Sequence, residues 1–290
     1  MDPQAILKYF PGWDGPDTVL TPFLAEEDAR AYTVWKVRGP EGMAVLKKTE
    51  ASEARAYDLF FSDRDPVPQI YGTYQVGEDT YLLMEYFPGR TLSKCQKSHL
   101  ILALDGLVAL QKKYWQAKER PDFPCTFDEE YTYLQGRMDY MEDLAFCYQA
   151  YLDLYETLPR TLCHDDLLPF NVLCDGKRAV FIDWEYAGIL PYPTALARLL
   201  AFGEEDEDFL FYMTDADRAF ALDYYYEKLI KNKGISRQDY DRTMQLFFFK
   251  EYSEWVYTAR KAGDLSGDYY KKYYKKSCAW AKALGLYQAK

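Results

Sequence analysis

The amino-acid sequence predicts an α+β protein in which a small lobe with an antiparallel β-sheet precedes a larger helical lobe. Short strand-like segments separated by turn residues fill the first third of the chain, whereas apolar residues recur at helical spacing through the rest. The pattern changes at Pro88-Gly89, where two residues that interrupt regular structure stand together. We therefore expect residues 1–87 to form the small lobe, 88–92 a hinge and 93–290 the helical lobe.

The small lobe is expected to contain two hairpins with one helix between them. Its predicted elements are strands at 32–39 and 42–48, a helix at 50–63, and two more strands within 67–87. A Gly-Pro-Glu-Gly turn joins the first two strands, which is typical of a hairpin. Thr49 and Ser52 are the possible N-caps of the helix, because their hydroxyl groups can accept from exposed backbone amides.

The helical lobe shows apolar residues at spacings of three and four over long stretches. The predicted helices cover 98–115, 129–155, 218–234, 237–264 and 267–285. Gly234 fits a helix C-terminus, where the left-handed conformation favours glycine. With 290 residues, 49% of them hydrophobic, the chain is long enough to bury a large core.

Composition excludes several classes of partner. The net charge of −11 argues against nucleic acid or an anionic membrane as the main partner. No segment is long and apolar enough to span a membrane, and the first residues lack the features of a signal peptide, so we expect a cytoplasmic protein. The six cysteines form no C-x-x-C pair and only two histidines are present, which argues against a zinc site. The sequence indicates no oligomeric state.

A β-hairpin with unusual polar flanks interrupts the helices. Val172–Cys174 and Ala179–Ile182 are apolar and flank the four turn residues 175–178. If those four residues form the loop, Asn171 lies opposite Ile182, one step from Asp183. Two oxygen-bearing side chains then meet at the open end of the hairpin, with His164 and Asp166 just before its first strand.

This set of side chains suits phosphoryl transfer. Asparagine and aspartate oxygens at one point suit a hard cation such as Mg²⁺, which usually keeps waters and bridges substrate phosphates. A further aspartate that is not a ligand can orient an attacking hydroxyl and accept its proton. Asp165 is adjacent to Asp166, and only spacing decides between them.

At these residues the chain resembles the aminoglycoside phosphotransferase and choline kinase family, which has a protein-kinase-like two-lobe fold. The octapeptide HDDLLPFN fits the pattern H-x-D-x-x-x-x-N, and FIDWE fits the metal-binding segment that follows. The wording DWEYAG is closest to the choline/ethanolamine kinase branch. The resemblance implies that Asp166 is the catalytic base, that Asn171 and Asp183 hold Mg²⁺, and that His164 packs the loop.

The resemblance continues into the small lobe and implies a nucleotide site there. The segment AVLKK looks like the strand whose lysine holds the α- and β-phosphates, which points to Lys47, with Lys48 as the alternative. Glu53 would be its ion-pair partner. Backbone groups of Glu85, Tyr86 and Phe87 would read the adenine edge. The implied cofactors are ATP, with GTP left open, and Mg²⁺.

Two departures from the family pattern stand out. The turn over the phosphates, Leu24–Thr33, contains no glycine and three acidic residues, with Arg30 as a possible compensation. Ala195 or a neighbour stands where the family often has an aspartate that braces the catalytic loop. The leading prediction is nevertheless a small-molecule kinase that acts on a hydroxyl. The alternative is a catalytically weak or inactive member that binds a nucleotide or ligand.

The acceptor is expected to contact the later helices. Glu251 and Trp255 are four residues apart and share one helix face, so a carboxylate and an indole could together hold an ammonium group. This favours an amine-bearing alcohol such as choline, ethanolamine or an aminoglycoside. A neutral sugar or nucleoside is the alternative acceptor.

Overall fold

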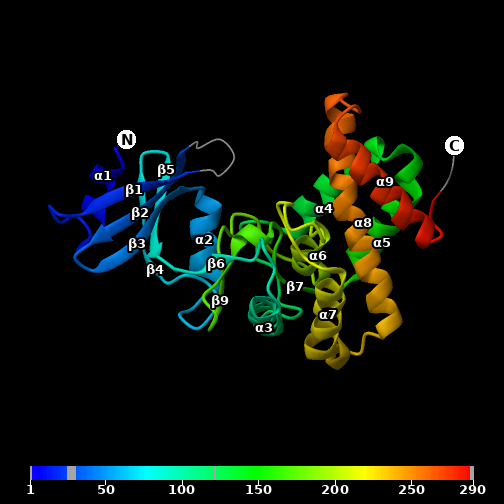
Figure 1. Ribbon diagram of the computed structural model, residues 1–290, viewed down its shortest axis with the longest axis horizontal. Helices are drawn as coiled ribbons and strands as arrows, with labels where there is room; N and C mark the ends of the chain where they lie inside the picture. The colour runs from blue at the N-terminus through cyan, green and yellow to red at the C-terminus, as the bar shows by residue number, and fades with distance from the viewer. Residues whose placement is uncertain (1, 25–30, 121, 288–290) are drawn as a thin grey trace.

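The protein consists of a sheet lobe beside a larger helical lobe, as Figure 1 shows for the computed structural model. The structure describes residues 2–24, 31–120 and 122–287. The fold class predicted from the sequence is confirmed, with five strands in one antiparallel sheet followed by mostly helical chain. The lobe boundaries at 87 and 92 stay a prediction.

The sheet lobe contains five antiparallel strands in the order β1-β2-β3-β5-β4. Their bounds are Val19–Leu24 (β1), Ala31–Gly39 (β2), Gly42–Thr49 (β3), Ile70–Val76 (β4) and Asp79–Glu85 (β5). Helix α2, Ala51–Phe60, lies between β3 and β4 in the chain. Its N-cap is Glu50, which makes no capping hydrogen bond, so neither Thr49 nor Ser52 caps it as predicted. The Thr49 hydroxyl instead donates to Glu53.

Strand β5, which lies between β3 and β4, is buried on both faces, and its two faces pack into different apolar clusters. Tyr81 and Leu83 pack in a small cluster with residues of the short N-terminal helices α1 (Pro3–Ile6) and η1 (Leu7–Tyr9). Leu82 and Met84 point the other way and join the main core, together with apolar residues of α2 and of the helical lobe. The main core therefore contains side chains of both lobes.

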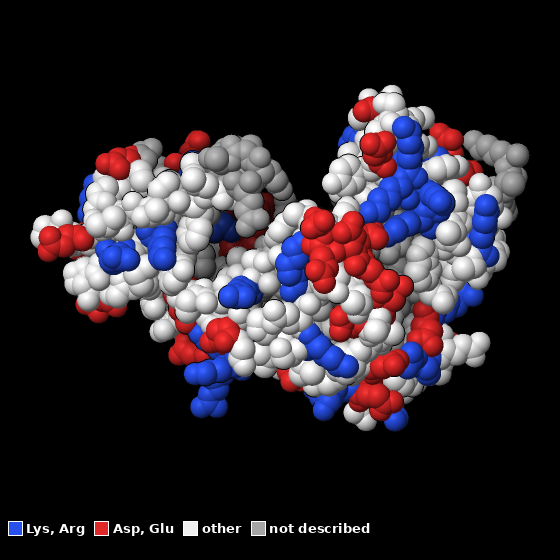
Figure 2. All heavy atoms as spheres, in the orientation of Figure 1, with Lys and Arg blue, Asp and Glu red and all other residues white. Residues whose placement is uncertain are grey.

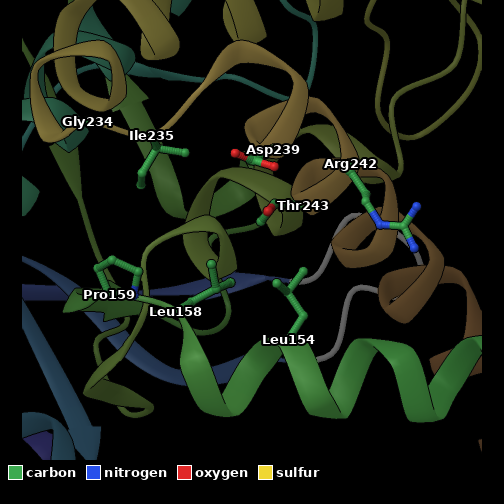
Figure 3. A pocket seen from close by; sticks show the side chains of 8 residues that line it. All are labelled: Leu154, Leu158, Pro159, Gly234, Ile235, Asp239, Arg242 and Thr243. Atoms are coloured by element: carbon green, nitrogen blue, oxygen red, sulfur yellow. The ribbon is translucent and has the colours of Figure 1, made fainter.

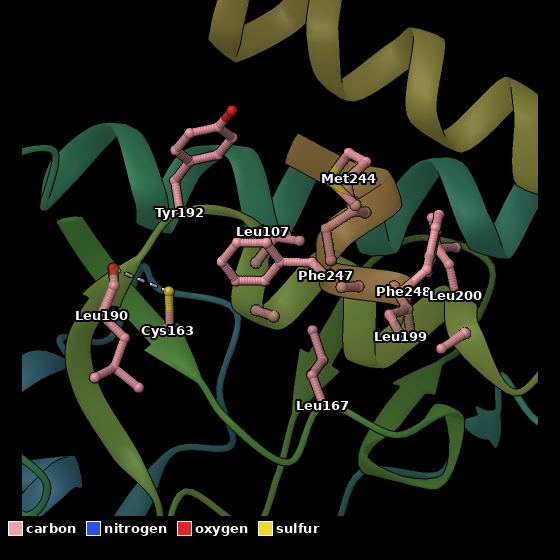
Figure 4. Close-up of a cluster of buried hydrophobic side chains, with 14 of the residues drawn as sticks. Leu107, Cys163, Leu167, Leu190, Tyr192, Leu199, Leu200, Met244, Phe247 and Phe248 are labelled. Atoms are coloured by element: carbon pink, nitrogen blue, oxygen red, sulfur yellow. Dashed lines mark hydrogen bonds between the residues drawn. The ribbon is translucent and has the colours of Figure 1, made fainter. Parts of the chain in front are cut away.

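The helical lobe is built around its longest helix, α8. Its helices are α3 (Lys97–Lys113), α4 (Phe127–Gln135), α5 (Ala145–Thr157), α6 (Pro193–Ala201), α7 (Asp215–Tyr225), α8 (Arg237–Ala262) and α9 (Asp268–Ala283). Short turns are η2 (Met138–Tyr140), η3 (Glu142–Leu144), η5 (Tyr226–Ile230) and η6 (Lys231–Lys233). Figure 4 shows Phe247 and Met244 of α8 beside Leu107 and Tyr192, with Cys163 donating to the Leu190 carbonyl at 3.5 Å.

Two helix predictions can be compared in detail. Gly234 ends its helix with φ of 77°, the left-handed conformation that was predicted from its position. The predicted helix 129–155 is divided into α4 and α5 by two short turns. Its apolar periodicity does not reveal the break, where Gly136 ends α4 and Glu142 adopts φ of 47°.

The polar-flanked hairpin has the predicted register. Strands β8 (Val172–Cys174) and β9 (Ala179–Phe181) pair as 172 with 181, 173 with 180 and 174 with 179. The short strand β6 (Arg90–Thr91) pairs with β8, so the hairpin is tied to the segment after the sheet lobe. A Cβ on Gly89 would lie 2.5 Å from the Phe87 ring and 2.9 Å from the Cys174 backbone. Glycine is therefore needed where the two segments cross.

Two further strands complete this region. Strand β7 (Arg160–His164) leads into the catalytic-loop sequence and pairs with β10 (Ala187–Pro191). The turn η4 (Pro169–Asn171) then connects the loop to β8.

The face shown in Figure 2 is hollowed between the sheet and the helices. On the helical part of this face, a group of acidic side chains lies beside a group of basic ones. Ion pairs join Glu204 to Lys272 and Lys276. Over the described residues, no helix combines the length and the hydropathy needed to cross a lipid bilayer.

Candidate active site

The open end of the hairpin brings two predicted metal ligands to one place. The Ile182 amide donates to the Asn171 carbonyl at 3.0 Å, which extends the pairing of β8 with β9 by one step. Asp183 follows directly with φ of 69°, a conformation that is uncommon outside glycine. Such backbone conformations persist where the surrounding structure holds them, and they are frequent at functional sites. Here the hairpin supplies that support.

The loop before the hairpin is fixed through its backbone. The Asp166 carbonyl accepts from the Leu168 amide at 2.7 Å and from Asn171 Nδ2 at 2.8 Å. His164 Nε2 lies 2.8 Å from the Ile182 carbonyl, and its ring packs 4.6 Å from that of Trp184. Burial lowers the pKa of His164, so the ring is a neutral packing element of this loop.

The donor set fits Mg²⁺. Because Asn171 Nδ2 is used as a donor, its side-chain oxygen is the atom left to coordinate, beside the carboxylate of Asp183. Among the described residues, no group of three histidine, cysteine, aspartate or glutamate side chains could hold a metal. Two protein oxygens with waters and phosphate oxygens are the coordination that Mg²⁺ commonly takes.

The strand lysine meets this site. Lys47 Nζ on β3 lies 2.6 Å from Glu53 Oε2 and 2.5 Å from Asp183 Oδ1. Burial acts to lower the pKa of Lys47, but the negative charges of Glu53 and Asp183 outweigh it and leave that pKa raised. Lys48 points to the opposite face of the strand and pairs with Asp79 at 2.8 Å. The structure thus brings Lys47, and not Lys48, to Asp183.

Part of the segment predicted to bind the adenine edge, residues 85–87, is already engaged within the protein. The Glu85 amide donates to the Gln69 carbonyl at 2.8 Å, so this amide cannot donate to a base. The Glu85 carboxylate pairs with Arg178 from the turn of the hairpin. The Tyr86 hydroxyl accepts from Lys36 at 3.3 Å, and Phe87 is buried beneath the Arg178 guanidinium.

Asp166 has a side-chain partner that the sequence analysis missed. Arg198 of α6 donates to Asp166 Oδ1 through Nε at 3.1 Å and through Nη2 at 2.8 Å. Arg198 Nη1 also donates to Glu251 at 2.9 Å. The available signal was a lone arginine in the otherwise apolar helix sequence PTALARLLA, three residues after Ala195.

The predicted pairing of Glu251 with Trp255 needs correction. Glu251 is 1% exposed, and its carboxylate is paired with Arg198 and with Lys250 at 3.1 Å. An ammonium group would have to displace two buried cations to reach it. Trp255 is 39% exposed and stacks on Tyr269 of α9 at 4.9 Å. Both residues do belong to one face of α8, but they do not form a joint cradle.

Two other carboxylates, Asp165 and Glu130, lie near the loop, and Lys250 acts electrostatically on both. Within the described ranges, neither Asp165 nor Glu130 makes an ion pair or a side-chain hydrogen bond. Burial, and then repulsion by Asp165, raise the pKa of Glu130 to about 8. The spacing left Asp165 as a loop residue, and nothing in the sequence singled out Glu130.

The two described pockets lie away from Asp166. One of about 330 Å³ is bounded by the end of α5 and the start of α8, where Figure 3 shows Leu154, Asp239 and Arg242 around it. Another of about 700 Å³ lies between α2, β4 and the Glu85–Arg178 pair. The glycine-free turn Leu24–Thr33, with Arg30, falls largely on residues 25–30, outside those that the structure describes.

Several solved structures share this architecture along nearly their whole length. A choline/ethanolamine kinase family protein from Mesorhizobium loti gives a TM-score of 0.62 at 17% identity, over 98% of this chain and 95% of that chain. An aminoglycoside phosphotransferase from Alicyclobacillus acidocaldarius gives 0.64 at 13% identity, over 98% and 94%. A thermostable aminoglycoside phosphotransferase mutant in ternary complex with ADP and hygromycin B gives 0.59 at 15% identity, over 97% of both chains. At these identities the likeness shows the fold.

Sequence comparison supplies the family. No curated protein matches the chain. The model of the phosphotransferase enzyme family matches residues 20–228, a stretch that contains the lysine strand, the catalytic-loop sequence and the hairpin with both candidate ligands. Because this match extends over more than half of the chain, the protein is a phosphotransferase and belongs to the phosphotransferase enzyme family, as the resemblance predicted.

Proposed function

We propose that the protein is an ATP-dependent kinase that transfers the γ-phosphoryl group to a hydroxyl of a small molecule. One observation carries this proposal: the strand lysine, the α2 glutamate and the hairpin aspartate form a single ion-paired group. These residues are far apart in sequence, and each has the residue type that phosphoryl transfer requires at its position.

Each residue has a distinct role in the proposed reaction. Asp166 accepts the proton of the acceptor hydroxyl as its oxygen bonds to the γ-phosphorus and the bond to the leaving ADP oxygen breaks. Lys47 binds the α- and β-phosphates, and Glu53 orients it. Asn171 and Asp183 would hold Mg²⁺, which neutralises the charge that develops on the phosphate oxygens. Glu85, Tyr86 and Phe87 bound the adenine site.

The acceptor class we propose is an amine-bearing alcohol, such as choline, ethanolamine or an aminoglycoside. The support is an excess of carboxylates at this place: the cations Arg137, Arg198 and Lys250 are already paired with Asp166, Glu251 and Glu254, while Asp165 makes no ion pair among the described residues. A cationic acceptor would pair with Asp165. The structures similar to this one include a protein crystallised with hygromycin B. Trp255 of α8 is exposed and would offer an aromatic surface to the ammonium group of the acceptor.

The first experiment tests nucleotide binding. Purified protein is heated with ATP or GTP, with and without Mg²⁺, and the midpoint of unfolding is recorded. A ligand at a hundredfold excess over its Kd adds about 2.7 kcal/mol to the free energy of unfolding. We expect a Mg²⁺-dependent rise with ATP that Asp183→Ala removes. No rise with either nucleotide would contradict the kinase proposal as a whole.

The second experiment tests the acceptor. A coupled assay of ADP release compares choline, ethanolamine and aminoglycosides with neutral sugars and nucleosides. We expect turnover with an amine-bearing alcohol, with KM raised by Asp165→Asn. Turnover only with a neutral acceptor would remove the amine proposal and leave the kinase proposal intact. Nucleotide binding without turnover on any acceptor would favour the catalytically weak or inactive member.

A further inference from the structure

The carboxylate of Asp166 is held by one side chain. Arg198 donates to Oδ1 twice, through Nε and Nη2, so both hydrogen bonds end on the same oxygen. Oδ2 receives no hydrogen bond from any described residue. The loop contacts from Leu168 and Asn171 reach the Asp166 carbonyl and fix the backbone, but they leave the carboxylate free to rotate. The orientation of the carboxylate therefore depends on Arg198.

Arg198 is itself fixed by a buried ion network. Its Nη1 lies 2.9 Å from Glu251 and 3.6 Å from Glu254. Lys250 pairs with both of these glutamates, and Arg137 pairs with Glu254 at 3.0 Å. Three cations and three carboxylates, counting Asp166, thus alternate in one connected group. Breaking a buried network of this kind leaves an uncompensated charge, so the arrangement has little freedom to move.

The network stands in for a missing part of the family pattern. The resemblance expects a bracing aspartate at Ala195 or a neighbour, and Ala195 is fully buried without a polar group. Arg198 is three residues further along α6, on the same helix face. We infer that Arg198 is a positioning residue that braces the catalytic loop by holding Asp166 Oδ1, so that Oδ2 takes the proton of the acceptor. This inference rests on the proposed kinase function.

The test compares Arg198→Met and Arg198→Lys with the unaltered enzyme. Because misplacing a catalytic group by about 1 Å can slow a reaction about 100-fold, we expect Arg198→Met to lower kcat by that order. The KM for ATP should stay within about threefold, since Arg198 does not contact the nucleotide residues. Arg198→Lys should recover part of kcat. Low millimolar guanidinium chloride should recover part of kcat in Arg198→Ala but none in Asp166→Ala.

The controls separate positioning from general stability. Arg237→Ala removes another ion-paired arginine of the helical lobe, at the first residue of α8, and should leave kcat unchanged. In the Asp166→Asn background, Arg198→Met should cause no further loss, because no base remains to position. Additive losses, or a fall in kcat that follows the unfolding midpoint, would overturn the inference.

A crystal structure of Arg198→Met keeps the inference testable if no acceptor is turned over. We expect the Asp166 carboxylate to leave its present orientation while Lys47 and Asp183 stay paired. An unchanged carboxylate would overturn the positioning role, whereas the kinase proposal is judged separately, on nucleotide binding and turnover.

Discussion

Individual side chains in the site should differ in what they contribute. Asp166→Ala is expected to lower turnover by about 10²–10⁴-fold, which is the usual contribution of a general base, while nucleotide binding survives. Asp183→Ala should lose both turnover and Mg²⁺-dependent binding, because the cation would join this residue to the phosphates. Asn171→Ala should be a milder form of the second variant. Isothermal titration with a non-hydrolysable nucleotide separates the two effects, and full turnover in Asp166→Ala would contradict its role.

The two adjacent lysines of β3 make a matched pair. Lys47→Ala should weaken nucleotide binding or turnover by about tenfold or more, because a hydrogen bond to a charged group contributes about 1.5–3 kcal/mol. Lys48→Ala removes an exposed ion pair with Asp79 and should change turnover little. Glu53→Ala should act in the same direction as Lys47→Ala. Steady-state kinetics on the three variants would decide, and a larger loss in Lys48→Ala would reverse the assignment.

Glu130 gives the stability of the protein a defined dependence on pH. Its folded-state pKa of about 8 lies above the ordinary 4.5, so the folded protein holds this proton more tightly than the unfolded chain. The free energy of unfolding should therefore fall as pH rises from about 4.5 to about 8. Glu130→Gln removes the titration, and its unfolding midpoint should exceed that of the unaltered protein at pH 8 but not at pH 4.

Calorimetry of both proteins at the two pH values measures this difference. Asp128→Asn, an exposed neighbour on α4, should change the midpoint much less at pH 8. An equal gain from Glu130→Gln at both pH values would show that the effect is unrelated to the proton.

The relative placement of single residues could be predicted where they lie within one short segment. The register of the hairpin follows from a four-residue turn, so the meeting of Asn171 with Asp183 could be read from the sequence. Arg198 reaches Asp166 across 32 residues and Glu251 across 53, and spacing gives no information about such contacts. The same reason explains why Glu251 was taken as accessible: its cations come from another helix and from its own neighbour.

At the scale of elements, the crossing of the hinge segment over β8 should be sensitive to any added atom. Gly89→Ala would bring a Cβ against the Cys174 backbone, which cannot move as a flexible side chain can. Overpacking of this kind typically destabilises a protein by about 1–3 kcal/mol. Urea denaturation should show this loss, whereas Gly136→Ala, at an exposed glycine with φ of −62° whose new Cβ meets no atom nearer than 3.5 Å, should change stability by about 0.5 kcal/mol or less. Equal effects would contradict the close approach.

Periodicity predicted most elements and missed how some of them end. Four of the five strands of the sheet lobe and Gly234 were predicted because alternation and a left-handed glycine are local signals, whereas β1 was not predicted. The division of 129–155 into α4 and α5 was not, because the apolar spacing continues across Glu142. Thr49 has the right residue type for an N-cap, but its hydroxyl is drawn to Glu53, a tertiary contact that a sequence pattern does not contain.

At the scale of the molecule, the shared core should make the sheet lobe dependent on the helices. Leu82, Met84 and the inner face of α2 are buried in the main core, so a fragment of residues 1–87 would expose them. We expect this fragment to lack a cooperative unfolding transition and to show poor dispersion in its NMR spectrum. The intact chain should unfold in one calorimetric transition. A folded fragment would instead indicate two independent units.

The hairpin of β8 and β9 is anchored at both ends. Asn171 and Asp183 lie at its open end, and Arg178 in its turn pairs with Glu85 at the end of β5. A rotation of the sheet lobe about residues 88–92 would displace Glu85. Through the ion pair, this displacement would move Arg178 and tilt strands β8 and β9 together. The same rotation that separates the two lobes would then also move Asn171 and Asp183. Since Arg178 is half-exposed, high ionic strength would screen the pair and uncouple that motion from the ligands.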